Sequence, residues 1–487
     1  MARSPLDRST SSVQLDTFSS YAPLDRSSSS DLERGESQRV RSVRSAEEED
    51  DEGGVEEELL LHHQHLEEPK RRRGIPPWVK QTGLFVLGAI FGTSVLSVIL
   101  RSLAGNPSSS PSSKSPDISP PPASETETFD FTVNPPVRIH YLEDQEKNSH
   151  QPLLPPSNCP IPVVYTKDQD SADIVVVNSD SHKGLEPEEF REWRERKPWQ
   201  KLAIWGVESA PNRDVLERHF DAVRDGRRNE TYDYDMTYRL NSTVPAVYSY
   251  SYFNYANQPV PYSSKRQDKI AASFITNCRP KNARTRILDE LTALLPDQVD
   301  NFGRCHNNAN ADETLREIGH YEDVGSSHNN WNTKVTMINY YKFSVAFENS
   351  NDYDYVTEKY FQALERGSVP LVFGAPNYRS RFFPSPNAAI DVADYLPSNY
   401  SLPSRSDSKE PEELSSEAKA GLAKLADRLK YLSSEEGRAE YDAMLEWKTN
   451  DRWREGDNPL GKIVKIATSE WDQDCKLARV FRGQDGS

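Results

Sequence analysis

Short apolar runs alternate with amphipathic stretches from about Phe129 onward. The runs "IPVVYTKD", "SADIVVVNS" and "KLAIWGVES" are each bounded by polar or turn residues, which is typical of buried strands. Between two of them, "GLEPEEFREWRERK" has the hydrophobic spacing of a helix. Strands that alternate with helices favour a parallel sheet that is covered on both faces.

The pattern loosens between about residues 210 and 262 and then restarts. The predicted strands are "DKIAASFITNC", "QVDNFGRC", "YYKFSVAFE" and "VPLVFG", and the predicted helices are "NARTRILDELTALL" and "TEKYFQALERG". Two such units with an irregular zone between them predict an α/β fold with two sheet domains that face a cleft.

The N-terminal part of the chain does not have the pattern of a packed domain. Residues 1–82 are predicted to be a disordered cytosolic tail, because residues 1 to about 69 are rich in Ser, Arg and acids and poor in aromatics. Residues 83–100 carry no charge and are long enough to cross a bilayer as a helix. The preceding cluster "KRRR" places the N-terminus in the cytosol, so a single-pass type II signal-anchor is expected.

This topology places the rest of the chain on the luminal, oxidising side of a membrane. Residues 101–128 form a predicted Ser/Pro stalk. The net charge of −17 argues against a nucleic-acid partner. The four cysteines can pair in such a compartment, and three acceptor sequons for N-glycosylation follow the anchor, at Asn229, Asn241 and Asn399.

The stretch "FENSNDYDYVTEKYFQALERGSVPLVFGAP" places an acid and a base at the start of a helix. Thr357 is a suitable N-cap and Gly367 a suitable helix end, so Glu358 and Lys359 lie in the first turn, beyond the carboxyl end of a strand. Open α/β sheets bind ligands there, and helix N-termini favour phosphate. From spacing alone, a solvated surface pair is the simpler interpretation.

The same segment resembles the donor-binding signature of the alpha-1,3-fucosyltransferases. Its elements are Phe-Glu-Asn-Ser at 347–350, Tyr-Val-Thr-Glu-Lys at 355–359 and Val-Pro-Leu-Val-Phe-Gly at 369–374. The stretches "WGVESAP", "MTYRLNSTVPAVY" and "ITNCRPKNARTRILDEL" resemble further family elements, although Ala210 interrupts a Glu-Ser-Pro element and Thr276 replaces Ser. "GRCHNN" is most similar to plant-type enzymes that act on the N-glycan core. The likeness covers about residues 135–475.

The resemblance implies a GT-B-like fold of two Rossmann-like domains. The acceptor-binding domain is expected at residues 129–262 and the GDP-fucose-binding domain at 263–397. An inserted loop is predicted at 398–416 and C-terminal helices at 417–487.

The implied reaction is the transfer of L-fucose from GDP-β-L-fucose to an N-acetylglucosamine of an N-glycan, with inversion, at the Golgi membrane. The resemblance implies that the reaction requires no cofactor and that Mn²⁺ acts at most as a stimulant of it. Glu208 is the implied general base, which takes the proton of the attacking hydroxyl. The implied donor-binding residues are Tyr238, Arg239, Thr276, Asn277, Arg284, Asn349, Tyr355, Glu358 and Lys359. Arg284 and Lys359 would hold the diphosphate, where cations lower the barrier to its departure.

The cysteines suggest two bridges. Cys278 follows one predicted donor-domain strand and Cys305 ends the next, and neighbouring parallel strands place such ends close together. Cys159 and Cys475 then remain as a link between the two ends of the chain.

Two other functions compete with a metal-independent fucosyltransferase. The pairs Asp233/Asp235 and Asp352/Asp354 match the Asp-x-Asp element of metal-dependent transferases. A non-catalytic, membrane-anchored glycan-binding protein is the other alternative, but it would not need Arg284 and Lys359 beside Glu208.

Overall fold

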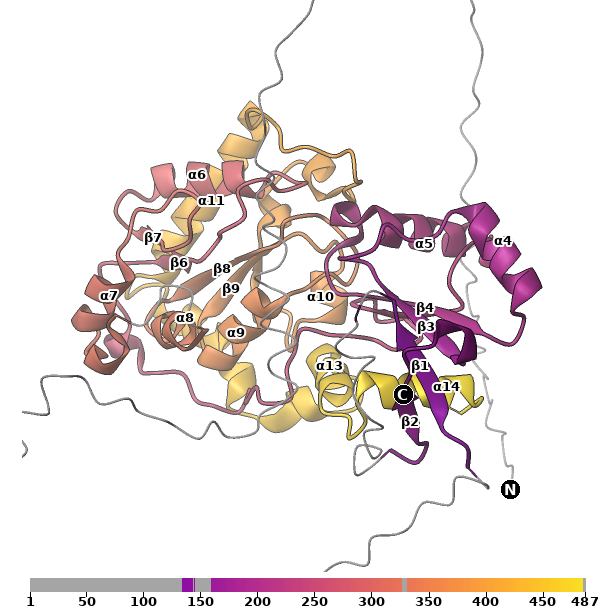
Figure 1. The fold of residues 1–487 in the computed structure, drawn as a ribbon. Helices are drawn as coiled ribbons and strands as arrows, with labels where there is room; N and C mark the ends of the chain where they lie inside the picture. Colours follow the sequence, from indigo (N-terminus) through magenta and orange to yellow (C-terminus); the bar gives the residue numbers. More distant parts are fainter. Residues whose placement is uncertain (1–133, 143, 145–158, 326–330, 485–487) are drawn as a thin grey trace, which may run out of the picture. The chain divides into compact units, whose positions relative to one another are not determined.

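The computed structural model describes residues 134–142, 144, 159–325 and 331–484 (Figure 1). The predicted tail, membrane anchor and stalk all lie outside these residues. Within them, no helix is both long and apolar enough to cross a membrane.

The first sheet contains five parallel strands in the order β2-β1-β3-β4-β5. The strands are β1 (Val137–Tyr141), β2 (Val163–Tyr165), β3 (Ile174–Asn178), β4 (Lys201–Gly206) and β5 (Tyr234–Thr237). Two helices belong to this part of the chain, α4 (Pro187–Arg196) and α5 (Asp214–Arg224). The three strands and the helix predicted here are confirmed. α5 and β5 lie in the zone where the sequence pattern loosens, because β5 is an edge strand with only two buried positions.

The second sheet is also parallel, in the order β10-β9-β8-β6-β7. Its strands are β6 (Ala271–Ser273), β7 (Val299–Asn301), β8 (Phe343–Phe347), β9 (Val369–Phe373) and β10 (Ile390–Asp391). The helices are α6 (Arg284–Leu294), α7 (Ala311–Glu317), α8 (Trp331–Ile338), α9 (Glu358–Arg366) and α10 (Tyr378–Arg381). The prediction of an α/β fold with two parallel sheets is therefore confirmed. β6 is shorter than expected, and the remainder of "DKIAASFITNC" is a loop.

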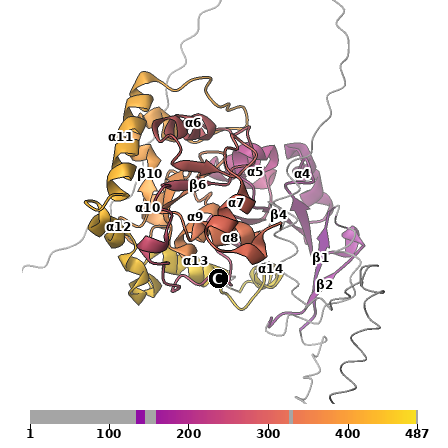
Figure 2. The same ribbon diagram turned by 90° about the vertical axis from the view of Figure 1, so that its left-hand side faces the viewer.

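The C-terminal helices do not form a unit of their own (Figure 2). They are α11 (Ser416–Leu432), α12 (Arg438–Met444), α13 (Pro459–Ala467) and α14 (Gln473–Phe481). α11 shares a hydrophobic core with α6 and the second sheet. α14 instead lies beside β2, and its Leu477 and Ala478 share a hydrophobic core with the first sheet. The end of the chain thus returns to the sheet where the described part begins.

The stretch predicted as an inserted loop has specific contacts to both sheet domains. Glu410 accepts hydrogen bonds from the first backbone amides of α6, those of Thr285 (2.8 Å) and Arg286 (2.9 Å). Arg405 pairs with Glu217 (2.8 Å) and Asp221 (2.7 Å) of α5. Short 3₁₀ helices complete the description: η2 (Gln169–Ser171), η3 (Ala210–Asn212), η4 (Arg228–Glu230), η5 (Tyr262–Ser264), η6 (Tyr321–Asp323), η7 (Val392–Tyr395), η8 (Ser398–Ser401), η9 (Glu446–Lys448) and η10 (Asp451–Arg454).

Candidate active site

The site lies where the loop after β4 meets the loop after β8. Glu208 and Ser209 follow β4, and Asn349 and Ser350 follow β8. The hydroxyl of Ser350 donates to that of Ser209 at 2.6 Å. Both loops leave the carboxyl ends of parallel strands, which is the edge where open α/β sheets bind ligands. The tertiary structure therefore joins segments that are 141 positions apart in the chain.

Glu208 is partly buried, and one of its carboxylate oxygens is densely hydrogen-bonded. Oε1 accepts from the backbone amide of Ser209 (2.7 Å), the side-chain amides of Asn212 (3.1 Å) and Asn349 (3.2 Å), and the hydroxyl of Tyr355 (2.8 Å). Among the described residues, none donates a hydrogen bond to Oε2.

These bonds set the charge of Glu208. Burial disfavours the carboxylate, but the donors, together with the nearby Arg213, outweigh it and hold the pKa of Glu208 below its ordinary value. Glu208 is therefore an anion at neutral pH. Its Oε2 is the oxygen that can accept a proton, as a general base must.

Tyr238 and Arg239 follow β5 and connect the two sheet domains through Asp352. The hydroxyl of Tyr238 accepts from the backbone amide of Ala210 at 2.8 Å and donates to Oδ2 of Asp352. The guanidinium of Arg239 pairs with the other oxygen of Asp352 and lies over the ring of Phe220, 4.7 Å from its centre. Asp352 is buried, and burial raises its pKa. Tyr238 and Arg239 thus support the loop that carries Glu208.

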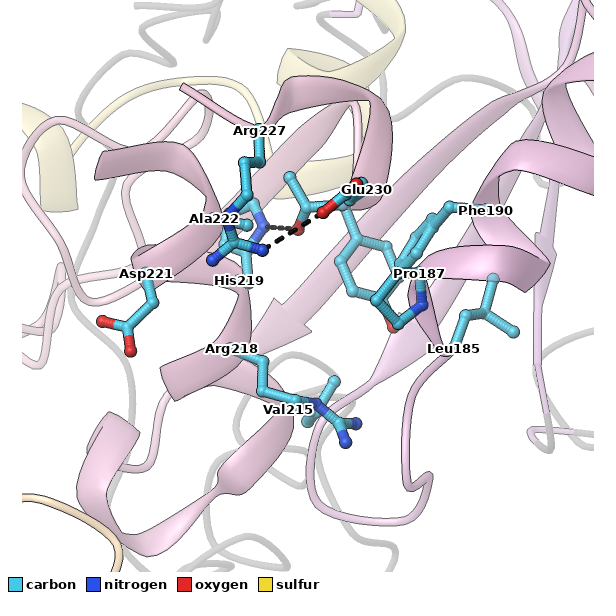
Figure 3. Close-up of a pocket in the computed structure, with 12 residues that line it drawn as sticks. Leu185, Pro187, Phe190, Val215, Arg218, His219, Asp221, Ala222, Arg227 and Glu230 are labelled. Atoms are coloured by element: carbon cyan, nitrogen blue, oxygen red, sulfur yellow. Dashed lines mark hydrogen bonds and ion pairs between the residues drawn. The ribbon is translucent and has the colours of Figure 1, made fainter. Parts of the chain in front are cut away.

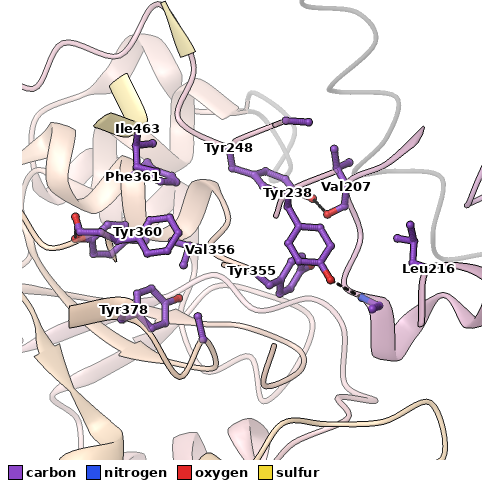
Figure 4. Close-up of a cluster of buried hydrophobic side chains, with 14 of the residues drawn as sticks. Val207, Leu216, Tyr238, Tyr248, Tyr355, Val356, Tyr360, Phe361, Tyr378 and Ile463 are labelled. Atoms are coloured by element: carbon purple, nitrogen blue, oxygen red, sulfur yellow. Dashed lines mark hydrogen bonds between the residues drawn. The ribbon is translucent and has the colours of Figure 1, made fainter. Parts of the chain in front are cut away.

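Aromatic rings fill the space between the two loops (Figure 4). Tyr355 lies edge-on to Tyr238 and to Tyr248, with ring centres 5.1 and 6.3 Å apart. Tyr248 donates to the backbone oxygen of Val207, the residue before Glu208, at 2.8 Å. This packing fixes Tyr355, and with it the hydrogen bond to Glu208.

Glu348 is a fully buried acid beneath the first turn of α9, with no exposed surface. It accepts from the backbone amide of Thr357 at 2.8 Å and from the Thr357 hydroxyl. Thr357 occupies the predicted N-cap position, but its side chain bonds Glu348 instead of a helix amide. Burial raises the pKa of Glu348 to about 7, although the ammonium of Lys359, 3.8 Å away, opposes this.

Glu358 and Lys359 occupy the first turn of α9, as predicted, and they are part of a charged cluster. The ammonium of Lys359 lies 3.4 Å from Oε1 of Glu358, and that of Lys334, on α8, lies 3.3 Å from the same atom. Burial disfavours the Glu358 anion, but the two ammonium groups lower its pKa to about 2. Near pH 7 the two cations therefore face one full anion and a partly protonated Glu348. This balance leaves net positive charge at a helix N-terminus, which suits an anionic ligand.

Arg284 starts α6 and is almost completely buried, with 2% of its surface exposed. Its guanidinium donates to the backbone oxygens of Phe347 (3.2 Å) and Asn277 (2.7 Å). It therefore fixes the loop after β6 against the end of β8. Thr276 and Asn277 are exposed in that loop, and their predicted contact with the donor stays a prediction.

Both predicted disulfides are present. Cys278 and Cys305 are linked, with Cα atoms 5.4 Å apart, and so are Cys159 and Cys475, with Cα atoms 5.8 Å apart. The first bridge ties the loop after β6, which carries Thr276 and Asn277, to the segment after β7. The second attaches α14 to the segment before β2. The predicted glycosylation sites Asn229, Asn241 and Asn399 are exposed, as glycan attachment requires.

The Asp-x-Asp pairs serve structural roles in this geometry. Asp354 accepts from the backbone amide of Leu240 and the side chain of Asn377, and Asp352 is held by Tyr238 and Arg239. In the other pair, Asp233 binds Arg194 at 2.8 Å and Asp235 binds Thr243 at 2.7 Å. Because protein donors already engage these carboxylates, the geometry does not favour the metal-dependent alternative.

A cavity of about 150 Å³ lies elsewhere in the first sheet domain (Figure 3). Its walls come from α4, α5 and the segment around η4, and include Phe190, Arg218 and Tyr232. None of the predicted site residues lines it. The cluster around Glu208 is the better candidate, because it combines an ionised carboxylate, cations and the carboxyl ends of strands from both sheets.

Four supporting residues of the site were not predicted from the sequence. Glu348 and Asp352 stand within the quoted segment, but no local signal shows that they are buried. Lys334 lies on a helix that was not predicted. Asn212 was also missed, and its position four residues after Glu208 is the one spacing that could have suggested contact.

Comparison with known proteins gives a family for part of the chain. Residues 264–402 match the model of glycosyltransferase family 10 (fucosyltransferase), C-terminal part. This range contains the second sheet and the donor-binding candidates from Thr276 to Lys359, and it leaves out Glu208 and Tyr238.

Similar curated proteins carry fucosyltransferase names. An Arabidopsis thaliana fucosyltransferase-like protein is 33% identical over 258 residues, which is 52% of this chain and 39% of that protein. Glycoprotein 3-alpha-L-fucosyltransferase A of Drosophila melanogaster is 34% identical over 145 residues, covering 28% and 25% of the two chains. Human GDP-fucose protein O-fucosyltransferase 3 is 27% identical over 225 residues, covering 45% and 39%. The chain thus spans less than half the length of each of these relatives.

Among solved structures, one of an alpha1,3-fucosyltransferase with GDP-fucose is 16% identical, with a TM-score of 0.33. The similarity covers 70% of this chain and 93% of that structure.

Proposed function

We propose that this chain, which carries a glycosyltransferase family 10 (fucosyltransferase) domain at residues 264–402, transfers L-fucose from GDP-β-L-fucose to a hydroxyl group of an acceptor, with inversion. The observation that carries the proposal is the arrangement around Glu208. An ionised carboxylate of the first sheet domain is held by Asn349 and Tyr355, which belong to the family domain. A base from one domain and a cationic cluster from the other are the two parts that such a transfer needs.

In the proposed mechanism, Glu208 takes the proton of the attacking hydroxyl. Oε1 is occupied by its four donors, so the hydroxyl approaches Oε2. The oxygen attacks the anomeric carbon of fucose as the bond to the diphosphate breaks. A single displacement of this kind converts the β-linked donor into an α-fucoside. General-base catalysis typically contributes about 10²–10⁴-fold to the rate.

The departing GDP is stabilised by positive charge in the second sheet domain. Lys359 lies in the first turn of α9, where the backbone amides of a helix N-terminus also favour phosphate oxygens. Arg284 fixes the loop that would lie beneath the diphosphate and adds a second cation. Cations aimed at the leaving oxygens lower the barrier because they interact most strongly with the charge that develops there.

For the acceptor, we favour an N-acetylglucosamine of an N-glycan, in α-1,3 linkage and at the core. The support is the "GRCHNN" element and the similarity to a glycoprotein 3-alpha-L-fucosyltransferase. A protein hydroxyl is the second candidate acceptor, because one relative is a GDP-fucose protein O-fucosyltransferase.

The cellular setting is proposed from the sequence. A single-pass type II protein of the Golgi membrane would have its catalytic part in the lumen, where the two disulfides can form. Protease treatment of sealed microsomes should then remove only the N-terminal tail. Digestion of the C-terminal part in intact vesicles would reject this topology.

The activity itself is tested by incubating the full chain with labelled GDP-fucose and a panel of acceptors. The panel should contain N-glycans with an accessible core, Lewis-type antennae and folded protein domains without glycans. Transfer to a glycan in the presence of EDTA is the expected result. Loss of transfer in EDTA would favour the metal-dependent alternative, and binding of glycans without transfer would favour a glycan-binding protein.

A further inference from the structure

A tyrosine-rich segment, "VYSYSYFNYA" at residues 247–256, connects the two loops of the site with the helix α9. At its beginning, Tyr248 bonds the backbone oxygen of Val207, beside Glu208, and packs against Tyr355 (Figure 4). At its end, the backbone amide of Asn254 donates to Oε1 of Glu365, on α9, at 3.3 Å. The segment therefore extends from the loop of Glu208 to the C-terminal part of α9, the helix whose first turn carries Lys359.

Tyr252 is the exposed member of this segment. Its ring lies parallel to that of Tyr250, with centres 5.3 Å apart and planes inclined by 15°. Phe253 meets it edge-on at 5.0 Å. Even so, 49% of the Tyr252 surface is exposed. The ring is thus supported by aromatic neighbours and still offers a large apolar area to solvent.

The aromatic packing behind Tyr252 continues into the hydrophobic core. Phe253 packs edge-on against Tyr255, and Tyr255 packs against Trp453, with centres 6.1 and 5.7 Å apart. Phe253 and Tyr255 are both buried. A flexible loop tip would not hold an aromatic ring in one orientation, whereas this row of rings does.

Tyr252 also lies near the acidic residues of α9. Burial is the largest cause that raises the pKa of the Tyr252 hydroxyl, and the carboxylates of Glu365 and Glu358 raise it further. Both acids lie on α9, and Glu358 belongs to its first turn, beside Lys359. The geometric link to the site is Tyr248, four residues earlier in the same segment, which contacts Val207 and Tyr355.

We propose that the ring of Tyr252 is the platform on which a sugar ring of the acceptor glycan stacks. A pyranose has one face covered by C–H groups, and these are attracted by the electron-rich face of an aromatic ring, which also shields them from water. The proposal rests on the proposed function and adds to it the part of the site that recognises the acceptor. The hydroxyl of Tyr252 is not needed for this contact, because stacking uses the ring alone.

Steady-state kinetics on variants of the full chain test this proposal. Tyr252→Ala should raise the KM for the glycan roughly three- to tenfold, the size expected for loss of one aromatic contact, and leave the KM for GDP-fucose unchanged. Tyr252→Phe should keep both constants at the wild-type value. The matched control is Trp199→Ala, because Trp199 is 56% exposed but precedes β4, at the opposite end of the strand from Glu208. This control should change neither constant.

The outcomes separate the proposal from its premise. If the wild-type chain transfers no fucose to any acceptor, the proposed function fails. If it transfers fucose and Tyr252→Ala leaves the glycan KM unchanged, the platform is wrong. A rise in the GDP-fucose KM alone would mean that Tyr252 stacks on guanine instead. If Tyr252→Phe raised the KM for the glycan as much as Tyr252→Ala, the hydroxyl, and not the ring, would make the contact.

Discussion

The hydroxyl of Tyr355 donates a hydrogen bond of 2.8 Å to Oε1 of Glu208, across a sequence separation of 147 residues. Tyr355 belongs to the second sheet domain and Glu208 to the first. The contact makes the ionisation of the base depend on the position of the other domain. It also gives Tyr355 a role besides the donor binding that the sequence implied.

Replacing Tyr355 with Phe should therefore shift the ionisation of Glu208 without removing the carboxylate. A hydrogen bond to the charged form lowers a carboxyl pKa, so its loss raises the pKa of Glu208. We expect the acid limb of the pH profile of kcat/KM to move to higher pH. Measurement of this profile for wild type and variant checks the prediction. An unchanged limb together with a raised KM for GDP-fucose would show that Tyr355 acts on the donor alone.

The base and the cationic cluster should be separable. Glu208→Gln keeps an oxygen that can accept from the four donors but removes the proton acceptor, so kcat should fall about 10²–10⁴-fold while GDP binds normally. Lys359→Ala removes a charge-assisted contact worth roughly 1.5–3 kcal/mol and should weaken GDP binding accordingly. Calorimetry with GDP and a transfer assay measure the two effects.

Lys359 gives a cleaner test of donor binding than Arg284. Arg284 is buried and braces two loops through backbone oxygens, so its removal should lower stability as well as affinity. Near-normal transfer by Glu208→Gln would contradict the mechanism, and the base would then have to be another carboxylate of the first sheet domain.

Glu348 should make the stability of the fold fall as the pH rises from about 4.5 to about 7. Its pKa is about 7 in the folded chain and 4.5 is its ordinary value. Between these values the folded state binds the proton more tightly than the unfolded state, so this stabilising contribution is complete below pH 4.5 and lost as pH rises through 7. Glu348→Gln, which cannot ionise, should abolish this component. Urea unfolding of both proteins at several pH values measures it, and identical pH dependence would disprove the assignment.

The two disulfides should contribute unequally to stability. Cys159–Cys475 closes 316 residues and Cys278–Cys305 only 27, and longer loops lose more entropy when they are closed. Paired Cys→Ser variants should each lose roughly 2–5 kcal/mol of unfolding free energy, with the larger loss for Cys159–Cys475. Denaturant unfolding of the two variants measures which of them loses more unfolding free energy. Peptide mapping under non-reducing conditions tests the pairing, and a free thiol at any of the four positions would argue against it.

Local patterns along the chain were sufficient to predict the elements with strong signals. The apolar runs around Val175, Ile204 and Val345 form buried strands, because they are too short for typical helices and a parallel sheet covered on both faces buries consecutive residues. Gly367 ends α9 in the left-handed conformation, at φ +67°, where any other residue would be strained and its Cβ would meet Pro259. These features depend on neighbours in the chain, so a pattern can predict them.

The tertiary structure decided which polar groups face each other. Glu208 and Tyr355, or Asp352 and Arg239, are far apart in sequence, and no periodicity indicates their contact. Burial and neighbouring charges are equally invisible in the sequence. Burial raises the pKa of Glu348, whereas two lysines lower that of Glu358, although the two residues are chemically alike. The charge state of the site depends on distances and on exclusion of water, and only the folded chain sets these.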